Sequence, residues 1–345
     1  MKRRVCVVGG GVVGLTCAEV LADEFDVTIV ADRFAAESAS IVATAIWHVY
    51  LVDKDDSSTL RWARETLEKL LEIARDHPEA GVSLVRGVEL FRKSEPHTPP
   101  WALIPPLFEM LSPNEIATFA RRDNPANAAA LPIKWGYRIE APAATMERYL
   151  PWLHNRVIAK GVCQVERRLS SLAEAADYGE LVINCSGYGA RALVPDASIS
   201  PVKGQYLVYP AGDGGPTEYL GDDDHPIETC YLIPRAGEVI IGGTEEYNDE
   251  SETFTRTVDE LLDRIAPFVP WVESLRNTAP TKSRVGLRPY REKGVLLALN
   301  GLHSPPVIHN IGHGGSGFSL SWGCANAVRD LVTAHFSVSS AAQLP

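Results

Sequence analysis

Two glycine-rich segments offer bare backbone that could bind an electron-rich group, and the first is a GxGxxG pattern. Gly9, Gly11 and Gly14 form it, after a short apolar run and at the start of a helical pattern over 12–22. One glycine allows the tight turn, one lets the backbone approach a pyrophosphate and one lets helix and strand pack closely. A carboxylate about 20 residues further on should bind a ribose hydroxyl, and Asp32 fits. The pattern predicts dinucleotide binding without separating a flavin from a nicotinamide.

The second segment lies near the other end of the chain. Gly312, Gly314, Gly315 and Gly317 precede an apolar helical pattern near 317–335. A helix N-terminus offers free N–H groups and a partial positive charge. This suits the pyrimidine edge of a flavin, because that edge gains negative charge on reduction. The second segment therefore indicates a flavin.

Other chemistries are weighed on the same residues. His309 and His313 have the four-residue spacing of a zinc pair. Glycines flank them and no glutamate follows as in HExxH, so both are interpreted as structural and no metal is expected. Ser316 has no GxSxG around it, which argues against a serine hydrolase. A nicotinamide-dependent dehydrogenase and a non-catalytic dinucleotide-binding protein stay open as alternatives.

The remaining pattern is that of an α/β chain. A length of 345 residues fits two domains, or one large domain with an inserted lobe. Alternating residues over 201–245 are typical of an antiparallel sheet, and prolines between 96 and 132 mark an irregular stretch. Further helices are expected at 59–75, 144–160 and 255–276.

Charge and apolar runs restrict the class of protein. A net charge of −11 argues against a nucleic-acid partner. No apolar run approaches the ~20 residues of a membrane span, and the apolar segment after the basic start is too short for a signal peptide. Six cysteines without a CxxC pair are typical of free, buried thiols in a reducing cytosol. A cytoplasmic protein that acts on small molecules is expected.

Six ordered segments together resemble the FAD-dependent D-amino acid oxidases and their D-aspartate oxidase relatives. The segments are VVGGGVVGLT, ADRF, VINCSGYGAR, YLIPR followed by IIGGT, RVGLRPYR and HNIGHGGSG, and the resemblance spans roughly residues 5–330. It implies an α/β plus α+β fold, with a Rossmann-type FAD-binding domain and a substrate domain built on an antiparallel sheet. The implied FAD-binding domain is discontinuous and comprises 1–52, 142–198 and 282–338, while 53–141 and 199–281 form the substrate-binding domain.

The resemblance also implies a substrate site. Arg288 and Tyr231 would clamp the substrate carboxylate, which agrees with the bidentate pairing of guanidinium and carboxylate. The main-chain carbonyl of Gly315 would hold the amine, and His48, Tyr50 and Ile227 would line the pocket. The implied reaction transfers the α-hydrogen of a D-amino acid as hydride to flavin N5. Water then hydrolyses the imino acid to a 2-oxo acid and ammonia, and molecular oxygen is reduced to hydrogen peroxide.

The FAD-binding positions implied by this resemblance come from both glycine segments and from the strand ends beside them. They are Gly9, Gly10, Gly11, Val12, Val13, Gly14, Asp32, Arg33, Ser38, Thr44, Ala45, Ile46, Leu169, Ser186, Gly187, Gly314, Gly317, Phe318 and Ser319.

The chain departs from the family pattern between residues 221 and 231. Ile227 stands where many members carry a second tyrosine on a lid. Members that prefer D-aspartate have a basic residue in this loop, whereas this chain has Asp222, Asp223 and Asp224. Charge runs usually face solvent, and that is the expectation here. Neutral, apolar D-amino acids are the predicted substrates, with acidic ones as the alternative; a homodimer is compatible with the family. The C-terminus lacks a peroxisomal tripeptide, which agrees with a cytoplasmic microbial protein.

Overall fold

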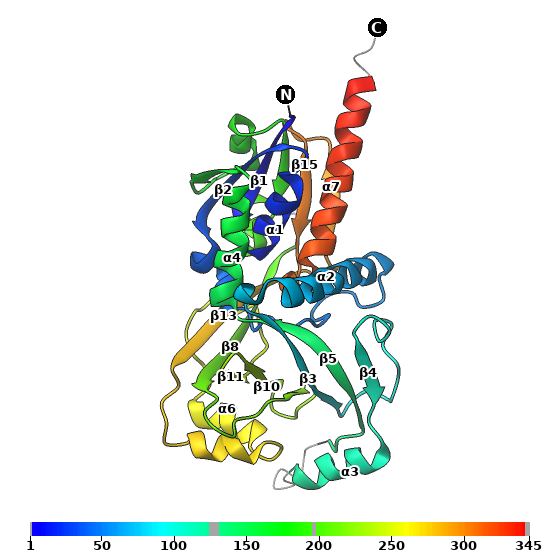
Figure 1. The fold of residues 1–345 in the computed structure, drawn as a ribbon, viewed down its shortest axis with the longest axis vertical. Coiled ribbons are helices and arrows are strands. Elements are labelled where there is room, and N and C mark those ends of the chain that lie inside the picture. Colours follow the sequence, from blue (N-terminus) through cyan, green and yellow to red (C-terminus); the bar gives the residue numbers. More distant parts are fainter. Residues whose placement is uncertain (1, 124–130, 195–197, 342–345) are drawn as a thin grey trace.

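Six strands form a mostly parallel sheet in the computed structural model, which describes residues 2–123, 131–194 and 198–341 (Figure 1). The strand order is β14-β15-β7-β1-β2-β6, and only the β14–β15 pair is antiparallel. The strands are β1 (Arg4–Gly10), β2 (Asp26–Phe34), β6 (Cys163–Glu166), β7 (Leu181–Asn184), β14 (Leu296–Asn300) and β15 (Val307–Ile311).

Strand β1 lies in the middle of this sheet and is buried on both faces. Val5, Cys6 and Val7 have no exposed surface, which explains why the strand is a continuous apolar run rather than an alternating one. Helix α1 (Val12–Leu21) packs against β1, and helices α4 (Met146–Ala159) and α7 (Gly317–Ala341) pack against α1. The βαβ start therefore carries the first glycine-rich turn at the carboxyl end of β1.

Nine strands form the second sheet, in the order β12-β8-β11-β10-β9-β3-β5-β4, with β13 paired to β8. Every pair is antiparallel except β3 with β9. The strands are β3 (Val82–Phe91), β4 (Leu107–Met110), β5 (Trp135–Ala144), β8 (Ser200–Pro210), β9 (Tyr219–Asp222), β10 (Cys230–Arg235), β11 (Glu238–Gly242), β12 (Glu246–Tyr247) and β13 (Lys282–Tyr290).

The two faces of the nine-stranded sheet differ because side chains alternate along each strand. One face is apolar: Leu90, Leu220 and Leu232 belong to a core cluster that α6 (Val258–Ile265) covers. The opposite face, here called the inner face, carries Tyr137 and Tyr231, which pack with the core that extends into the first sheet. The inner face is therefore the side on which the two sheets meet.

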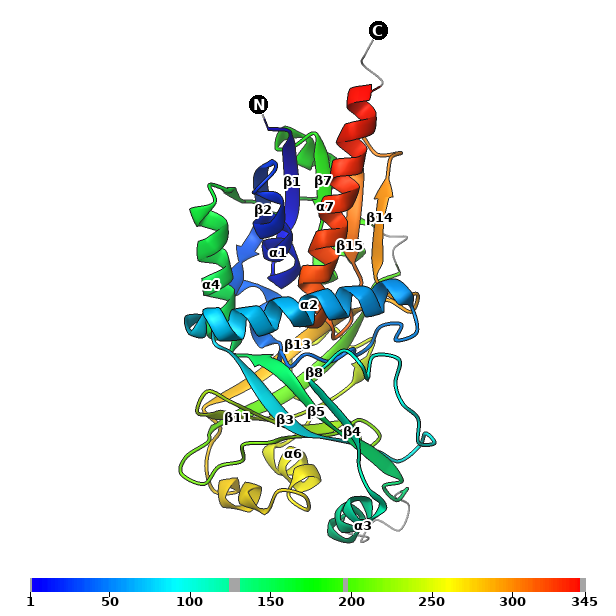
Figure 2. The ribbon, with the colours of Figure 1, turned by 45° about the vertical axis from the view of Figure 1, so that its right-hand side comes forward.

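Helix α2 (Ser57–Asp76) crosses between the two sheets (Figure 2). Its N-terminus is capped by Asp56, whose carboxylate accepts from the backbone N–H of Thr59 at 2.7 Å. It packs tightly on α7, where the N–H of Gly323 donates to Thr66 Oγ1 at 2.9 Å and a Cβ on Gly323 would overlap the backbone of Trp62. Helices α3 (Pro113–Arg122) and α5 (Ala190–Leu193) are peripheral.

The predicted fold class is confirmed, and three details differ from expectation. The helix expected at 255–276 is α6 followed by a separate short turn over 270–275, because Pro270 begins a new turn. Residues 282–290 were assigned to the FAD-binding segments but pair with β8 of the nine-stranded sheet. Cys163 is exposed, while the other five cysteines are buried and free. The domain boundaries themselves stay a prediction, and within the described ranges no helix is long and apolar enough to cross a membrane.

Candidate active site

The first glycine-rich turn has no room for side chains. A Cβ on Gly14 would overlap the carbonyl oxygen of Gly9, and one on Gly9 would overlap the carbonyl oxygen of Cys185 at the end of β7. The backbone of Gly9 has φ +121°, a region that favours glycine. Across the described chain, the N–H groups of Val13 and Gly14 at the start of α1 have no protein acceptor. They are therefore available to an anion.

The second glycine-rich segment brings the start of α7 beside the start of α1. A Cβ on Gly317 would lie 3.8 Å from Val13 Cγ2 and 3.9 Å from Val12 Cγ1. The partial positive charges of the two helix N-termini consequently lie close together. One elongated anionic or electron-rich ligand could contact both.

A loop over 46–51 is held against the start of α7 by two serines. Ser319 Oγ accepts from the backbone N–H of His48 at 3.0 Å, and Ser316 Oγ accepts from that of Tyr50 at 2.7 Å. A Cβ on Gly315 would overlap the ring of Tyr50, so this glycine makes room for the ring. The Tyr50 ring therefore packs on the side of Gly315 where a side chain would otherwise lie.

Glycines on the inner face make room for Arg288 and Tyr231. The guanidinium of Arg288, on β13, occupies the space that a side chain on Gly204 of β8 would fill. The ring of Tyr231 lies over Gly242, whose Cβ position would be 2.6 Å from Tyr231 Cζ. The structure therefore brings these two predicted residues to one face of the sheet.

Arg288 uses only part of its hydrogen-bonding capacity within the protein. Its Nη1 donates to the carbonyls of Thr244 at 3.0 Å and Lys203 at 3.4 Å, and its Cζ lies 5.6 Å from the centre of the Tyr50 ring. No carboxylate among the described residues forms an ion pair with it. A guanidinium with free donors in a half-buried position is suited to bind an external carboxylate.

Tyr231 lies on the same face of the sheet as Arg288, within reach of its charge, and remains a neutral phenol. Burial raises the pKa of Tyr231, and the nearby Arg288 charge offsets only part of this effect. The phenol therefore keeps its proton and can donate one oriented hydrogen bond.

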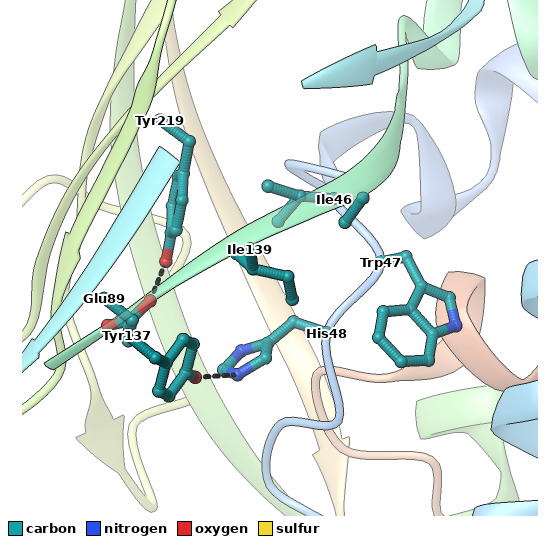
Figure 3. A pocket seen from close by; sticks show the side chains of 8 residues that line it. Ile46, Trp47, His48, Glu89, Tyr137, Ile139 and Tyr219 are labelled. Atoms are coloured by element: carbon teal, nitrogen blue, oxygen red, sulfur yellow. Dashed lines mark hydrogen bonds between the residues drawn. The ribbon is translucent and has the colours of Figure 1, made fainter. Parts of the chain in front are cut away.

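A small cavity between the inner face and the loop over 46–51 is lined by Glu89, Tyr137 and Tyr219 from the inner face and by His48 from the loop (Figure 3). Tyr219 donates its hydroxyl to the Glu89 carboxylate, and Tyr137 Oη lies 3.3 Å from His48 Nε2. Burial, with a smaller contribution from Lys54, lowers the pKa of His48 to about 3. The imidazole is consequently neutral.

The expectation that the acidic run 222–224 faces solvent is wrong. Asp222 is fully buried and accepts from the guanidinium of Arg92 at 2.7 and 2.8 Å, while Asp224 accepts from the Arg92 backbone N–H at 3.1 Å. Asp223 is half-buried and accepts from Thr229 Oγ1 at 2.9 Å. The run lies inward because the buried Arg92 side chain needs a counter-charge.

The remaining positions expected to bind the cofactor surround the two helix starts. Gly187 has φ +56° and open space beside its Cα, and Ser186 donates to the Asn184 side chain at 2.6 Å. Asp32 and Arg33 are exposed at the end of β2. The other positions are Gly10 and Gly11 in the turn, Ser38, Thr44, Ala45 and Ile46 between β2 and α2, buried Leu169, Gly314 before α7, and buried Phe318 in its first turn. Their roles stay predictions.

Ile227 and the two histidines of the second glycine-rich segment are not part of the Arg288 and Tyr231 clamp. Ile227 is 62% exposed, so its side chain does not line the cavity in this structure. His309 and His313 are buried; His309 Nδ1 lies 3.3 Å from Asn184 Nδ2, and burial lowers the pKa of His313 to about 4. No group of three metal-ligating side chains occurs among the described residues.

Sequence reasoning missed Glu89, Tyr137 and Tyr219. Each follows the period of two along its strand and could have been assigned to the same face, but strand alternation does not show what that face meets. The signal for Glu89 was a carboxylate within the largely apolar segment LVRGVELF.

A family model described as FAD dependent oxidoreductase matches residues 4–331. The chain belongs to this family. Among curated proteins it is 36% identical to a D-amino-acid oxidase of Rubrobacter xylanophilus, with 97% of both chains covered. It is 33% identical to a D-aspartate oxidase of Homo sapiens, covering 96% of this chain and 94% of the relative. The fold is similar to that of glycine oxidase from Geobacillus kaustophilus, with a TM-score of 0.76, 21% identity and coverage of 96% and 95%.

FAD is the cofactor of this family, and the residues present fit it. The two adjacent helix starts, with free N–H groups at α1 and a side-chain-free surface at Gly317, suit a diphosphate and a flat ring. The first glycine-rich turn would hold the diphosphate and the second segment the flavin edge. Arg288 and Tyr231 would then be left for the substrate.

Proposed function

We propose that this enzyme oxidises D-amino acids to 2-oxo acids with release of ammonia and hydrogen peroxide. The observation that carries the proposal is Arg288, a half-buried guanidinium without a carboxylate partner in the described chain, on the same face of the sheet as the neutral phenol of Tyr231. The family membership and the D-amino-acid oxidase and D-aspartate oxidase relatives support it. The substrates are then a D-amino acid and molecular oxygen. A cytoplasmic location and a homodimer remain predictions.

The carboxylate of the substrate would be fixed at one end of the site. Arg288 supplies a planar fork of N–H donors, and Tyr231 adds a single hydrogen bond from a neutral hydroxyl. The main-chain carbonyl of Gly315 would accept from the substrate amine. These contacts select one enantiomer of the substrate. Carboxylate, amine and side chain occupy three fixed positions, so the α-hydrogen can point in only one direction.

FAD, when bound, supplies the two-electron acceptor for the α-hydrogen and passes the electrons to oxygen. The chain contributes orientation and electrostatics. The N-terminus of α7 places positive potential where the ring would gain charge, and the glycines before it let ring and substrate approach the backbone. His48 is neutral and bonded to Tyr137, so it is not assigned as a base. The reaction needs none at the α-carbon when hydrogen leaves as hydride.

Acidic D-amino acids are the second candidate, since one relative is a D-aspartate oxidase. The charges near the pocket argue against them. Glu89 and Asp223 are the acidic groups there, and neither supplies the positive charge that would pair with an acidic substrate side chain. The neutral, apolar side chain predicted from sequence is compatible with the cavity but does not use these carboxylates.

The test is a stoichiometry measurement on the purified, flavin-loaded enzyme. With D-methionine we expect oxygen uptake matched by equal amounts of 2-oxo acid, ammonia and peroxide, and no reaction with L-methionine. Reduction of a nicotinamide without oxygen uptake would instead support the dehydrogenase alternative. Absence of any product across a panel of D-amino acids would refute the proposal.

A further inference from the structure

A buried carboxylate on the inner face, Glu89, has no role in the proposed reaction. Glu89 is 1% exposed, and its Oε2 accepts a hydrogen bond from the Tyr219 hydroxyl. In the part of the chain that is described, Oε1 has no hydrogen-bond partner. A buried carboxylate oxygen without a partner is costly, so this oxygen indicates a ligand group that the protein itself does not supply.

Strand register places Glu89 in the same row as Tyr231, one of the two clamp residues. Glu89 of β3 is opposite Gly221 of β9, and Gly221 is opposite Tyr231 of β10. Two strand spacings, about 10 Å, therefore separate the Glu89 and Tyr231 backbones. A Cβ on Gly221 would overlap the Glu89 carboxylate, so the missing side chain lets this carboxylate lean toward the clamp.

One wall of the cavity around Glu89 is the loop that carries His48, a residue predicted from sequence to line the substrate pocket. The cavity in Figure 3 is bounded by Glu89, Tyr137 and Tyr219 on one side and by Ile46 and His48 on the other. The loop that carries His48 is tied to the start of α7 through Ser319. A substrate held by its carboxylate at Arg288 could therefore extend its side chain toward Glu89.

The charge balance in this part of the site is acidic. Asp223 is close enough to both Glu89 and Tyr231 for its negative charge to raise the pKa of each. Lys54 and Arg288 are the cations whose charge reaches Asp223. Lys54 is exposed and Arg288 is reserved for the substrate carboxylate, so neither forms an ion pair with Glu89. Burial is the largest cause of the raised pKa of Glu89, and a bound cation would favour its ionised form.

We propose that Glu89 is a specificity-determining residue that selects D-amino acids with a long cationic side chain, such as D-lysine or D-arginine. The terminal ammonium or guanidinium would donate to Glu89 Oε1, and Asp223 would add electrostatic attraction. The separation of about 10 Å between the Glu89 and Tyr231 backbones suits an unbranched side chain of this length. The inference rests on the proposed function and names its substrate class.

The experiment compares D-lysine with D-norleucine, which has the same carbon chain without the ammonium group. We expect kcat/KM of the flavin-loaded wild type to be higher for D-lysine than for D-norleucine. Glu89→Gln should lower the D-lysine to D-norleucine ratio by about 10- to 100-fold, as expected for losing a charge-assisted hydrogen bond. Glu109→Gln is the matched control. It makes the same chemical change at an exposed residue of β4, away from the site. It should leave the ratio unchanged.

The outcomes separate this inference from the function on which it rests. If D-norleucine is oxidised but the wild type does not prefer D-lysine, or Glu89→Gln keeps the ratio, the inference fails while the proposed function stands. If no D-amino acid is oxidised, the proposed function fails and the inference with it. Should Glu89→Gln not fold, the wild-type preference and Asp223→Asn decide: a smaller loss of the same ratio in Asp223→Asn supports the inference, and an unchanged ratio overturns it.

Discussion

Replacing Arg288 with alanine tests the substrate clamp most severely. Among the described residues its guanidinium donates to the carbonyls of Thr244 and Lys203, and both carbonyls lose this donor in the variant. With substrate bound, the loss is larger, because a half-buried carboxylate is left without its counter-charge. Breaking such a pair costs roughly 3–5 kcal/mol, or about two to three and a half powers of ten in kcat/KM. Arg288→Lys keeps the charge but loses the planar fork, so its kcat/KM should lie between those of the wild type and the alanine variant.

The assay is steady-state oxygen uptake over a range of D-amino acid concentrations, with the flavin content of each variant measured by absorbance. Arg284→Ala is the control, since Arg284 lies on the same strand and face but faces the Glu147 carboxylate at 3.8 Å. We expect Arg284→Ala to change kcat/KM by less than about threefold. If the Arg288→Ala variant carries a full complement of flavin and its kcat/KM also lies within about threefold of the wild type, the clamp is refuted.

Three further predictions concern the cofactor turn, the phenol and pH. Gly14→Ala places a methyl group on a neighbouring carbonyl oxygen and should yield protein with little bound flavin. Gly301→Ala is the control, because nothing lies within 4 Å of the added methyl group, and it should bind flavin as the wild type does. The ratio of flavin to protein absorbance measures this, and equal ratios in the two variants would contradict the reasoning. Tyr231→Phe removes one neutral hydrogen bond and should lower kcat/KM about tenfold, mostly through KM; a change confined to kcat would argue against carboxylate binding. The pKa of His313 is lowered from 6.5 to about 4 by burial, so the unfolded chain binds a proton between these values and the folded chain does not. The unfolding free energy should therefore fall by about 2 kcal/mol between pH 7 and pH 5, and His313→Gln should lose that part of the pH dependence in urea titrations.

Local signals were sufficient for the elements that begin and end at strong sequence features. Helix α2 was expected at 59–75 and spans Ser57–Asp76, because its apolar residues recur at helical spacing and Asp56 caps its start. The two glycine-rich turns could be placed because only glycine tolerates their backbone geometry and close approach.

Tertiary partners could not be read from the same signals. Residues 282–290 were assigned to the FAD-binding segments, and nothing local showed that they pair with β8 rather than with the first sheet. The inward orientation of Asp222 depends on Arg92, which is 130 residues away and whose burial is a property of the packed sheet. Glu89 joined the candidate site because it lines the cavity beside His48 and shares a row of the second sheet with Tyr231, and both relations come from tertiary packing.

Anaerobic mixing of the purified flavoprotein with single amino acids tests the central claim most directly. Oxidised flavin absorbs near ~450 nm, where protein side chains do not, and loses that absorbance when it accepts two electrons. We expect D-lysine and D-methionine to bleach the band without oxygen, their L-enantiomers to leave it unchanged, and readmitted oxygen to restore it with formation of peroxide. A preparation without bound flavin, or a band that no D-amino acid bleaches, would contradict the account.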